Sequence, residues 1–516
     1  MVSVVVASFL TRTFVAQPGY TDAFYHFNAA NRLVSGQGLT DAYLWTYISA
    51  PNNLPAPSHL YWMPLTSLIA ALGMGLLGQA GNYGAAQWPF ALLLAGTSCL
   101  GFWLGGRLGG SRRHAWVAGL LTLFSGFFTR FWGATDTFAP YALIGSLCLL
   151  FLGLGTCASS CRHRIMYFAL AGITAGLGHL TRADGLLLLI VGWAVILWPQ
   201  KAKRGISALF QQRSFSLVTI AFAYLLVMTP WFIRNLNLVG SPLPTGGTRA
   251  IWFTEYDDLF NYPPDSNPNT FFANGMSALF VSRWEALTNN LGTLVAVEGL
   301  VVMTPLMLIG LWRRRNNGFL RGFWLYALGL HLAMTLVFPY PGYRGGLFHS
   351  SAALVPWWSA LGVVGLDDAV DWVARRRRHW NAGVAKAIFS ASLVVTAFFL
   401  SLSSAQHGRT VAGTPELYYA LSAQLPANAR VMINDPAQLY YFTGLGGVVL
   451  PNESPEVIVD IAQKYHIGYL LLEGVTDDGL TAQAPQELWP ILTSPPDFLT
   501  LISLNAPGVR LYEIHR

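Results

Sequence analysis

Charge is scarce in this 516-residue chain: only 11% of its residues are Asp, Glu, Lys or Arg, against about 25% in a soluble domain. Hydrophobic residues make up 53% of the sequence. This balance excludes an ordinary soluble protein and predicts a polytopic α-helical membrane protein. The net charge of +7 does not predict nucleic-acid binding, because most basic residues lie in short segments between apolar runs.

Cysteine is also rare, and none of the four cysteines lies in a segment that we expect outside the membrane. The sequence therefore predicts no external disulfide. Cys157 and Cys161 lie near His163 at a spacing that a metal site could use. Because no second pair of ligands follows, a reduced pair at a helix end is the favoured interpretation. The four are Cys99, Cys148, Cys157 and Cys161.

About eleven apolar runs approach the ~20 residues that a bilayer requires. Basic residues gather in alternate connections between them, such as Arg375 to Arg378. Cytoplasmic loops are rich in Lys and Arg, so we expect a cytoplasmic N-terminus and an extracytoplasmic C-terminus in the cell (plasma) membrane. The runs span 1–16, 86–106, 115–131, 138–156, 165–181, 185–199, 214–233, 290–311, 322–338, 350–366 and 384–403.

One further apolar segment, 64–79, does not fit this orientation. If it crossed the bilayer, every later loop would change sides and the arginine clusters would face outwards. We therefore expect an interfacial or re-entrant helix that is covered by protein.

The composition changes near residue 404, where Asp, Glu, Pro and Asn become more frequent. Ser454 and Pro455 are suited to the N-cap and first position of a helix through 462. The glycines of 444–447 indicate a turn. Alternating strands and helices predict a small extracytoplasmic α/β domain over 404–516, after a membrane module over 1–403. The predicted strands are 431–434, 448–450, 469–472, 499–502 and 510–514.

The first predicted outer loop, 17–85, is unusually long; a second long outer loop covers 234–289. The first loop opens on Asp22, within the aromatic stretch 19–27. A carboxylate at the edge of the bilayer is costly unless it meets water, a cation or a substrate. Loops of this length are usually functional or disordered, and this one is too aromatic for disorder. We expect it to form the mouth of an active site for a lipid-borne substrate.

Two carboxylates stand at predicted helix ends, Asp22 after the first run and Asp136 before the fourth. One can act as the general base for an incoming hydroxyl. The second can orient the acceptor, or both can hold a divalent cation that neutralises phosphate, although no cofactor is certain. The structural alternatives are that Asp22 is a capping carboxylate and that Thr135–Asp136 caps the next helix.

Phosphate binding would have to rest on arginine or histidine, because the predicted outer membrane loops contain no lysine. The planar guanidinium forms paired bonds with phosphate. Arg234 and Arg344 emerge at the predicted outer interface, and glycines beside Arg344 allow close approach. Either residue could instead anchor the protein at lipid headgroups.

Other polar and aromatic residues of these loops are candidates for substrate contact, and each has a structural alternative. The histidines could pack within the loop, and the aromatic rings could form an interfacial belt. We expect Asp184 to pair with Arg182 or to cap a helix. The candidates are Tyr25, His26, Asp41, His59 and Tyr61, with Trp45, Tyr47 and Trp62 as stacking surfaces and His349 nearby.

Several motifs in a fixed order resemble the GT-C glycosyltransferase superfamily, close to bacterial relatives of protein O-mannosyltransferases and aminoarabinose transferases. The resemblance covers about 1–400, and each motif alone is weak. The matching segments are 22–27, the Gly36-x-Gly38 region from Ala29, His59–Leu65, Thr181–Gly185 and 230–242.

The resemblance implies inverting transfer of a sugar from a polyprenyl-phosphate donor to a glycan, lipid or protein acceptor on the outer face of the membrane. Asp22 would match the family's first-loop acid, the presumed base, and Asp136 its second acid. The chain departs from protein O-mannosyltransferases in one respect, because no second acid stands beside Asp22.

Two other functions remain open. A non-enzymatic lipid or solute transporter would be expected to show repeated halves and polar mid-span residues. No clear repeat occurs, and Glu298 and His331 are the exceptions to a nearly uncharged set of runs. A glycan-binding scaffold without turnover is the third hypothesis.

Overall fold

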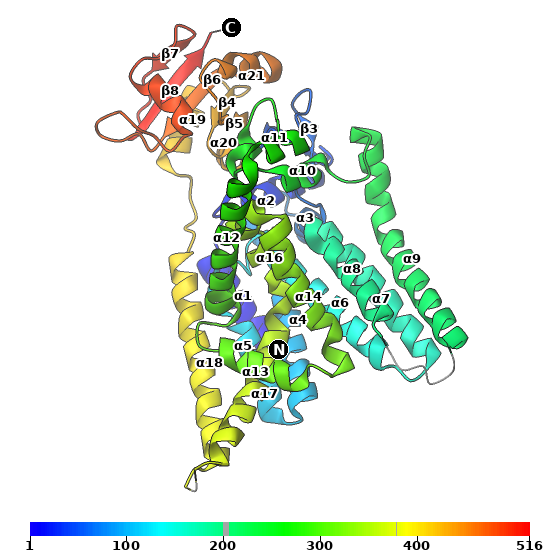
Figure 1. Cartoon of the computed structure of the whole chain (residues 1–516). Coiled ribbons are helices and arrows are strands. Elements are labelled where there is room, and N and C mark those ends of the chain that lie inside the picture. Colours follow the sequence, from blue (N-terminus) through cyan, green and yellow to red (C-terminus); the bar gives the residue numbers. More distant parts are fainter. Residues whose placement is uncertain (200–205, 378, 516) are drawn as a thin grey trace.

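A computed structural model of the chain describes residues 1–199, 206–377 and 379–515. Most of this part is helical, and a mixed sheet with short helices stands at one end of the helical bundle (Figure 1). Helices α9 and α18 stand at opposite edges of the bundle in this view. The bundle therefore carries the membrane-spanning part, and the sheet lies beyond it.

Each predicted apolar run contains helix. The agreement is not complete at the ends, because α9 continues beyond the predicted limit at 233 and α12 begins inside the predicted loop 234–289. The helices are α1 (Val2–Phe14), α4 (Tyr83–Gly109), α5 (Arg112–Leu123), α6 (Phe138–Cys157), α7 (Cys161–Thr181), α8 (Leu186–Leu197), α9 (Ile206–Val239), α12 (Gly275–Thr293), α13 (Thr304–Arg314), α14 (Arg321–Leu332), α17 (Val355–Ala374) and α18 (Ala382–His407).

Among the described residues, six helical segments are long and apolar enough to cross a membrane. Three shorter apolar helices accompany them, Val2–Phe14, Leu65–Leu77 and Ala183–Leu197. The protein is therefore a helical membrane protein, and the total of eleven spans stays a prediction. The six are Tyr83–Gly109, Phe138–Cys157, Phe210–Val239, Gly318–Val337, Pro339–Ala374 and Ala382–His407.

Close helix packing depends on glycine at two contacts. A Cβ on Gly105 of α4 would lie 2.3 Å from the His114 carbonyl oxygen of α5. A Cβ on Gly365 of α17 would lie 1.8 Å from the Leu306 carbonyl oxygen of α13. Small residues let membrane helices approach until their backbones touch, which strengthens van der Waals packing.

The prediction of one continuous span over 290–311 is wrong. After α12 a π-helical turn runs to Glu298, and Leu300 and Val301 then adopt positive φ angles of 46° and 64°. Helix α13 restarts at Thr304, with a proline in its first turn, where the missing N–H costs nothing. The mid-span Glu298 lies in this break.

Glu298 and His331 are partners. The Nε2 atom of His331 lies 3.2 Å from Glu298 Oε1, and Trp358 Nε1 donates to Glu298 Oε2 at 2.7 Å. Ionisable residues within membrane spans commonly pair in this way. The two exceptions to the uncharged spans therefore pair with each other, and Glu298 is buried whereas His331 is partly exposed.

The first loop is an ordered structure with two helices, α2 (Thr21–Val34) and α3 (Leu65–Leu77). Helix α3 has 13 residues and is about 20 Å long, shorter than the ~30 Å hydrocarbon core. Its membrane position, interfacial or re-entrant, stays a prediction. The short strands are β1 (Thr40–Asp41), β2 (Tyr43–Leu44) and β3 (Ala56–Pro57), and β1 pairs antiparallel with β3.

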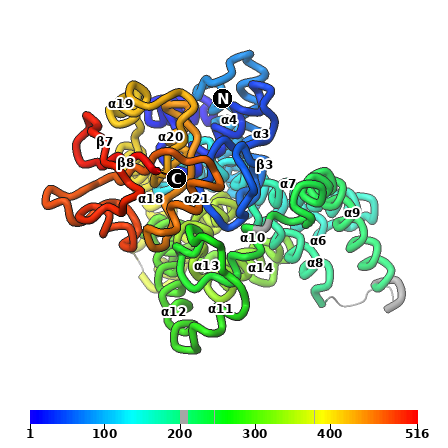
Figure 2. Tube along the Cα trace, turned by 90° about the horizontal axis from the view of Figure 1, so that it is seen from above, coloured from blue at the N-terminus to red at the C-terminus, as the bar shows by residue number. Residues whose placement is uncertain are grey.

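A six-stranded sheet forms from the C-terminal part together with β2 of the first loop, in the order β2-β5-β4-β6-β8-β7. β2, β5, β4 and β6 are parallel, and β8 runs antiparallel to both of its neighbours, β6 and β7. Seen from above, these elements lie beside the first loop (Figure 2). The strands are β4 (Arg430–Ile433), β5 (Gly446–Val449), β6 (Tyr469–Glu473), β7 (Leu499–Ile502) and β8 (Val509–Ile514).

Five C-terminal strands lie where the sequence predicts them, but two local predictions are wrong. Helix α21 (Val457–Tyr465) begins at Val457 and not at the predicted Pro455. A tighter i→i+3 bond from Val457 N to the Ser454 carbonyl precedes it. The predicted turn at 444–447 divides: Gly444 ends helix α20 (Pro436–Thr443) at φ 75°, whereas Gly446 and Gly447 belong to β5. The remaining short helices are α10 (Thr245–Arg249), α11 (Pro268–Ala273), α15 (Pro339–Pro341), α16 (Leu347–Ser351) and α19 (Glu416–Gln424).

Glu473, at the end of β6, predicts a pH effect on stability. Burial and the nearby Asp435 raise the pKa of Glu473 from its ordinary 4.5 to about 7. The fold therefore favours the protonated side chain, and this stability is lost as the pH rises through about 7. We expect Glu473→Gln to raise the Tm at pH 8 and to leave it little changed at pH 5.

The matched control is Glu513→Gln, which changes an exposed carboxyl group on β8 of the same sheet. Differential scanning fluorimetry of both variants across this pH range measures the effect. Equal Tm shifts for the two variants at pH 8 would contradict the prediction.

Candidate functional site

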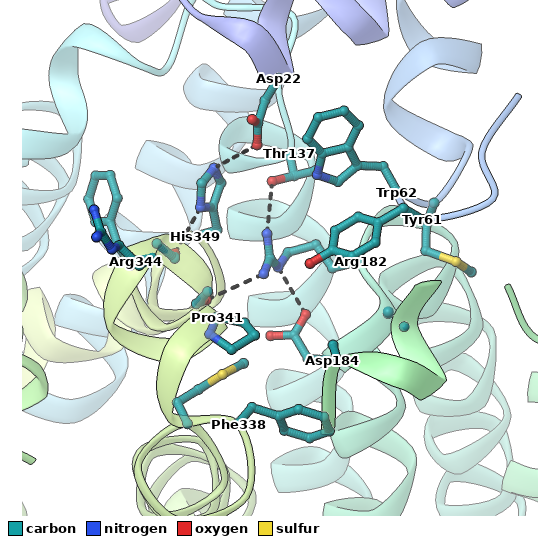
Figure 3. Close-up of a pocket in the computed structure, with 18 of the residues that line it drawn as sticks. Asp22, Tyr61, Trp62, Thr137, Arg182, Asp184, Phe338, Pro341, Arg344 and His349 are labelled. Atoms are coloured by element: carbon teal, nitrogen blue, oxygen red, sulfur yellow. Dashed lines mark hydrogen bonds and ion pairs between the residues drawn. The ribbon is translucent and has the colours of Figure 1, made fainter. Parts of the chain in front are cut away.

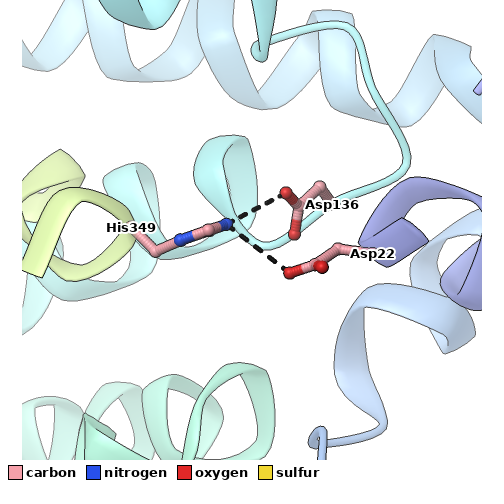
Figure 4. A group of neighbouring side chains, drawn as sticks. All are labelled: Asp22, Asp136 and His349. Atoms are coloured by element: carbon pink, nitrogen blue, oxygen red, sulfur yellow. Dashed lines mark hydrogen bonds and ion pairs between the residues drawn. The ribbon is translucent and has the colours of Figure 1, made fainter. Parts of the chain in front are cut away.

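The centre of the site joins three elements that are far apart in sequence. Asp22 lies in the first turn of α2, Asp136 lies just before α6, and His349 belongs to α16 (Figure 4). His349 Nε2 lies 3.1 Å from Asp136 Oδ2 and 3.8 Å from Asp22 Oδ2. Both carboxylates that the sequence singled out therefore face one imidazole.

Asp136 is fixed more firmly than Asp22. Its Oδ2 accepts from the Tyr20 hydroxyl at 2.8 Å, and its Oδ1 accepts from the Thr137 backbone N–H at 2.5 Å. The Asp136 side chain is fully buried, whereas 29% of the Asp22 side chain is exposed. Asp22 is thus the carboxylate that an incoming molecule can reach.

The two carboxyl groups have different proton affinities. Burial and the neighbouring Asp136 raise the pKa of Asp22 to about 7. Burial alone would also raise the pKa of Asp136, but the His349 ring outweighs it and holds that pKa below its usual range. Environment therefore divides the pair into a fixed anion and a group that exchanges a proton near neutral pH.

These three side chains have the donor set of a divalent-cation site. Their ligand atoms, two carboxylate oxygens and one imidazole nitrogen, lie within 4.8 Å of one another. His349 Nδ1 lies 2.8 Å from the Gly345 carbonyl, which can only accept, so Nδ1 carries the proton. Nε2 then faces one oxygen of each carboxyl group, a position that a shared proton or a cation can occupy. The residues fit a bound divalent cation.

Arg182 links the segments that carry Asp136 and His349. Its Nε donates to Asp184 Oδ1 at 2.9 Å and to Ser350 Oγ at 2.7 Å, and its Nη1 lies 3.4 Å from Thr137 Oγ1. The Ser350 hydroxyl also bonds to Asp184. The predicted local pair of Asp184 with Arg182 is confirmed. Arg182 also contacts Thr137, which follows Asp136, and Ser350, which follows His349.

A cavity of about 720 Å³ opens beside these residues (Figure 3). In this view, Arg344 lies on one side of Arg182, and Tyr61 and Trp62 lie on the other. One wall of the cavity is apolar and comes from α8, α14 and the segment that follows α14. These side chains are Leu186, Leu187, Ile190, Leu330, Met334 and Phe338.

Arg344 is available for an anionic ligand. Its guanidinium lies 5.2 Å from the centre of the Tyr256 ring and lines the cavity. In the described part of the chain it forms no ion pair with a carboxylate. Gly345 beside it has a φ of 143°, a conformation that a side chain would oppose.

Aromatic rings line the opposite side of the cavity. Trp45 and Trp62 stack with ring centres 3.8 Å apart, and Tyr61 meets the Trp45 ring edge-on at 5.0 Å. All three line the cavity. Flat aromatic faces of this kind suit the apolar face of a sugar ring. Tyr61 lies at the cavity, and its contact with a substrate stays a prediction.

Four other predicted residues lie outside the cavity lining, in a buried network within the first loop. The Tyr25 hydroxyl donates to Asp41 Oδ2 at 2.9 Å and accepts from the His59 backbone N–H at 2.6 Å. Ser67 Oγ lies 2.9 Å from both His26 Nδ1 and His59 Nε2. These side chains hold the loop in shape, and burial lowers the pKa of both histidines.

Arg234 also lies outside the cavity lining. Its Nη2 donates to the Ser58 carbonyl at 2.8 Å, and its guanidinium stacks 4.4 Å from the Trp231 ring. Arg234, which belongs to α9, thereby holds the first loop against this helix. Of the two predicted phosphate ligands, Arg344 is the one at the cavity.

The sequence assigned no role to His349 and gave Arg182 only its local pair with Asp184. Both were visible: His349 follows the glycines beside Arg344, and Arg182 lies in the Thr181–Gly185 motif. Their partners are 213 and 168 residues away, so no local pattern marks the contacts.

The fold and the cavity define the class of this protein. It is a helical membrane protein with the GT-C fold, as the order of the sequence motifs indicated. No protein-family model matches the chain, and no curated protein matches its sequence. The likeness is therefore carried by three-dimensional structure.

Two solved structures illustrate the likeness. The oligosaccharyltransferase of Archaeoglobus fulgidus, solved with zinc and sulfate, matches 91% of this chain and 67% of its own chain, with a TM-score of 0.59 and 13% identity. ArnT from Cupriavidus metallidurans, bound to undecaprenyl phosphate, matches 99% of this chain and 96% of its own, with a TM-score of 0.58 and 12% identity. At these identities the comparison establishes the fold.

Proposed function

We propose that this protein is a glycosyltransferase that moves a sugar from a polyprenyl-phosphate donor to an acceptor at the outer face of the cell membrane, with inversion. The observation that supports it is a single cavity in which the Asp22–Asp136–His349 centre, an available arginine and an apolar wall meet. ArnT, which shares the fold, was solved with such a lipid phosphate.

In the proposed reaction the polyprenyl chain lies against the apolar wall, and Arg344 binds the phosphate through paired charge-assisted bonds. The acceptor hydroxyl attacks the anomeric carbon from the face opposite the phosphate. The new glycosidic C–O bond forms as the bond to the phosphate oxygen breaks, and the hydroxyl proton passes to Asp22. Polyprenyl phosphate leaves, and Tyr61 and Trp62 stack on the sugar.

A divalent cation fits this proposal. Asp22, Asp136 and His349 would hold it, and when bound it would neutralise negative charge on the phosphate. Arg182 keeps the Asp136 turn and α16 together, whether or not a cation is present. The acceptor would be a glycan, lipid or protein with a nucleophilic hydroxyl. Donor and acceptor would enter the cavity from the membrane or from the outer side.

The experiment that tests the function is transfer of labelled sugar by the purified protein in lipid, from a panel of polyprenyl-phosphate sugars. Turnover of one donor supports the transferase. Donor binding without turnover across the panel would favour a glycan-binding scaffold. Neither binding nor turnover would favour a transporter.

Arg344 gives a second expected result. Loss of a hydrogen-bonded charge typically costs about 1.5–3 kcal/mol, so we expect Arg344→Ala to raise the donor KM about 10- to 100-fold. Arg344→Lys keeps the charge without the planar fork and should restore part of the loss. Steady-state kinetics against donor concentration measure both.

The matched control is Arg283→Ala. Arg283 is also held against an aromatic ring, that of Phe271, but does not line the cavity. We expect the donor KM of Arg283→Ala to stay near that of wild type. Equal KM changes for the Arg344 and Arg283 variants would contradict phosphate binding by Arg344.

A transporter remains the second candidate, on one observation. The Glu298–His331 pair lies at a helix break within a predicted span, which is where transporters bind coupling ions. Uptake into proteoliposomes that Glu298→Gln abolishes, in the absence of sugar transfer, would favour it.

A further inference from the structure

The turn between β4 and α20 reaches the candidate active site from the C-terminal part of the chain. Asn434, the first residue after β4, lines the same cavity as Asp22. Asp435 follows it and is the N-cap of α20. A segment more than 400 residues from Asp22 in sequence therefore forms part of the cavity wall.

The Asp435 carboxylate joins the beginnings of two helices. Its Oδ1 accepts from the Gln438 backbone N–H at 2.9 Å, which caps α20. Its Oδ2 accepts from the Thr21 hydroxyl at 2.6 Å. Thr21 is the first residue of α2, and Asp22 is the next.

Helix α2 has no capping side chain of its own. Its N-cap residue is Tyr20, which makes no side-chain cap bond because its hydroxyl is directed to Asp136. The first N–H groups of a helix lack intrahelical partners, and a nearby anion stabilises that end. The Asp435 carboxylate supplies both the bond to Thr21 and the negative charge.

The Asp435 carboxylate is itself held in a rigid frame. Strand β4 lies inside the sheet, between β5 and β6. Helix α20 lies against α2 (Figure 1), where Asn28 Nδ2 donates to the Ala437 carbonyl at 2.8 Å and Arg32 Nη1 donates to the Tyr440 hydroxyl at 2.9 Å. The position of Asp435 relative to α2 is therefore fixed on two sides.

We propose that Asp435 is a positioning residue for Asp22, acting through the Thr21 hydroxyl. The inference rests on the proposed function, in which Asp22 accepts the proton of the acceptor. Asp435 does not line the cavity, so its effect passes through α2. The C-terminal part of the chain thereby sets the orientation of the Asp22 carboxylate, in addition to forming part of the cavity wall.

The test compares Thr21→Val, which removes the hydroxyl at nearly constant shape, with Thr21→Ser, which keeps it. A misplaced catalytic group can cost about 100-fold in rate, so we expect Thr21→Val to lower kcat about 10- to 100-fold with little change in donor KM. Thr21→Ser should retain most of kcat. Hydrogen exchange of the amides at 22–25 should be faster in Thr21→Val than in wild type.

Two further variants separate positioning from other effects. Tyr440→Phe removes the bond from Arg32, in the last turn of α2, while the bond from Asn28 to Ala437 still holds α20 against α2. This variant should therefore leave kcat and the exchange of 22–25 near wild type. Since Thr21 itself lines the cavity, the double variant Thr21→Val/Asp435→Ala tests the route. If Thr21 acts through Asp435, the double variant is no slower than Asp435→Ala alone.

Each outcome decides the inference. Equal kcat losses in Tyr440→Phe and Thr21→Val, or additive losses in the double variant, would overturn it while leaving the transferase intact. If wild type transfers no sugar from any donor, the proposed function fails. Hydrogen exchange then still decides whether Asp435 orders the first turn of α2, and unchanged exchange in Thr21→Val would overturn that role as well.

Discussion

Asp22→Asn is expected to lower sugar transfer about 10²–10⁴-fold, the range that positioned proton transfer contributes. Asparagine keeps the size and polarity of the side chain but cannot accept the proton of the acceptor. Asp22 is the exposed member of the centre, with its Oδ2 3.8 Å from His349 Nε2. The loss should therefore be found in kcat, while donor binding stays close to wild type.

The measurement pairs transfer rates with donor affinity and Tm for the same preparations. The matched control is Asp257→Asn, which removes an exposed carboxylate that does not line the cavity. That variant should transfer at the wild-type rate. Full activity in Asp22→Asn would exclude Asp22 as the base, and a parallel loss of Tm would make the effect structural.

His349→Ala is expected to abolish tight binding of a divalent cation. Loss of a residue that only orients a metal ligand commonly costs 10–100-fold in affinity, and loss of a ligand itself should cost at least about that much. The His349 ring is fixed by Gly345 and by stacking 4.0 Å from Phe138. Its removal leaves the two carboxylates without the nitrogen ligand of the proposed site.

Titration with Mn²⁺, followed by electron paramagnetic resonance, measures this affinity without any sugar substrate. His407→Ala, which removes an exposed histidine on α18, is the control. Transfer by wild type should cease with a chelator and return with Mn²⁺. Wild-type protein that binds no Mn²⁺ and stays active in the chelator would show that the carboxylates work without a cation.

The sequence predicted the parts of the fold that depend on local pattern. Apolar runs indicated where helices lie, because burying a backbone in lipid requires continuous internal hydrogen bonds. The break at Glu298 was not predicted from the apolar run, although Gly299 and Pro305, which follow it, are residues that interrupt helices. The strands β1, β2 and β3 have only two residues each, which is too short for a recognisable alternation of apolar and polar side chains.

The candidate site was predictable only in part. Asp22 and Asp136 could be recognised because a carboxylate at a membrane edge requires an explanation. His59, Asp41 and Arg234 have the same residue types and lie in the same loops, yet their bonds point into the protein. Composition cannot separate a polar group that faces a cavity from one that satisfies a buried partner.

The pairing of β2 with β5 has a consequence for how the molecule is made. Tyr43 and Leu44 find their strand partners at Gly447 and Val448, about 400 residues later in synthesis. The first loop therefore emerges early with an unpaired edge and completes its structure only when the last fifth of the chain has been translated. Chains whose synthesis stops before residue 434 would insert their helices and still lack the part of the cavity wall that Asn434 forms.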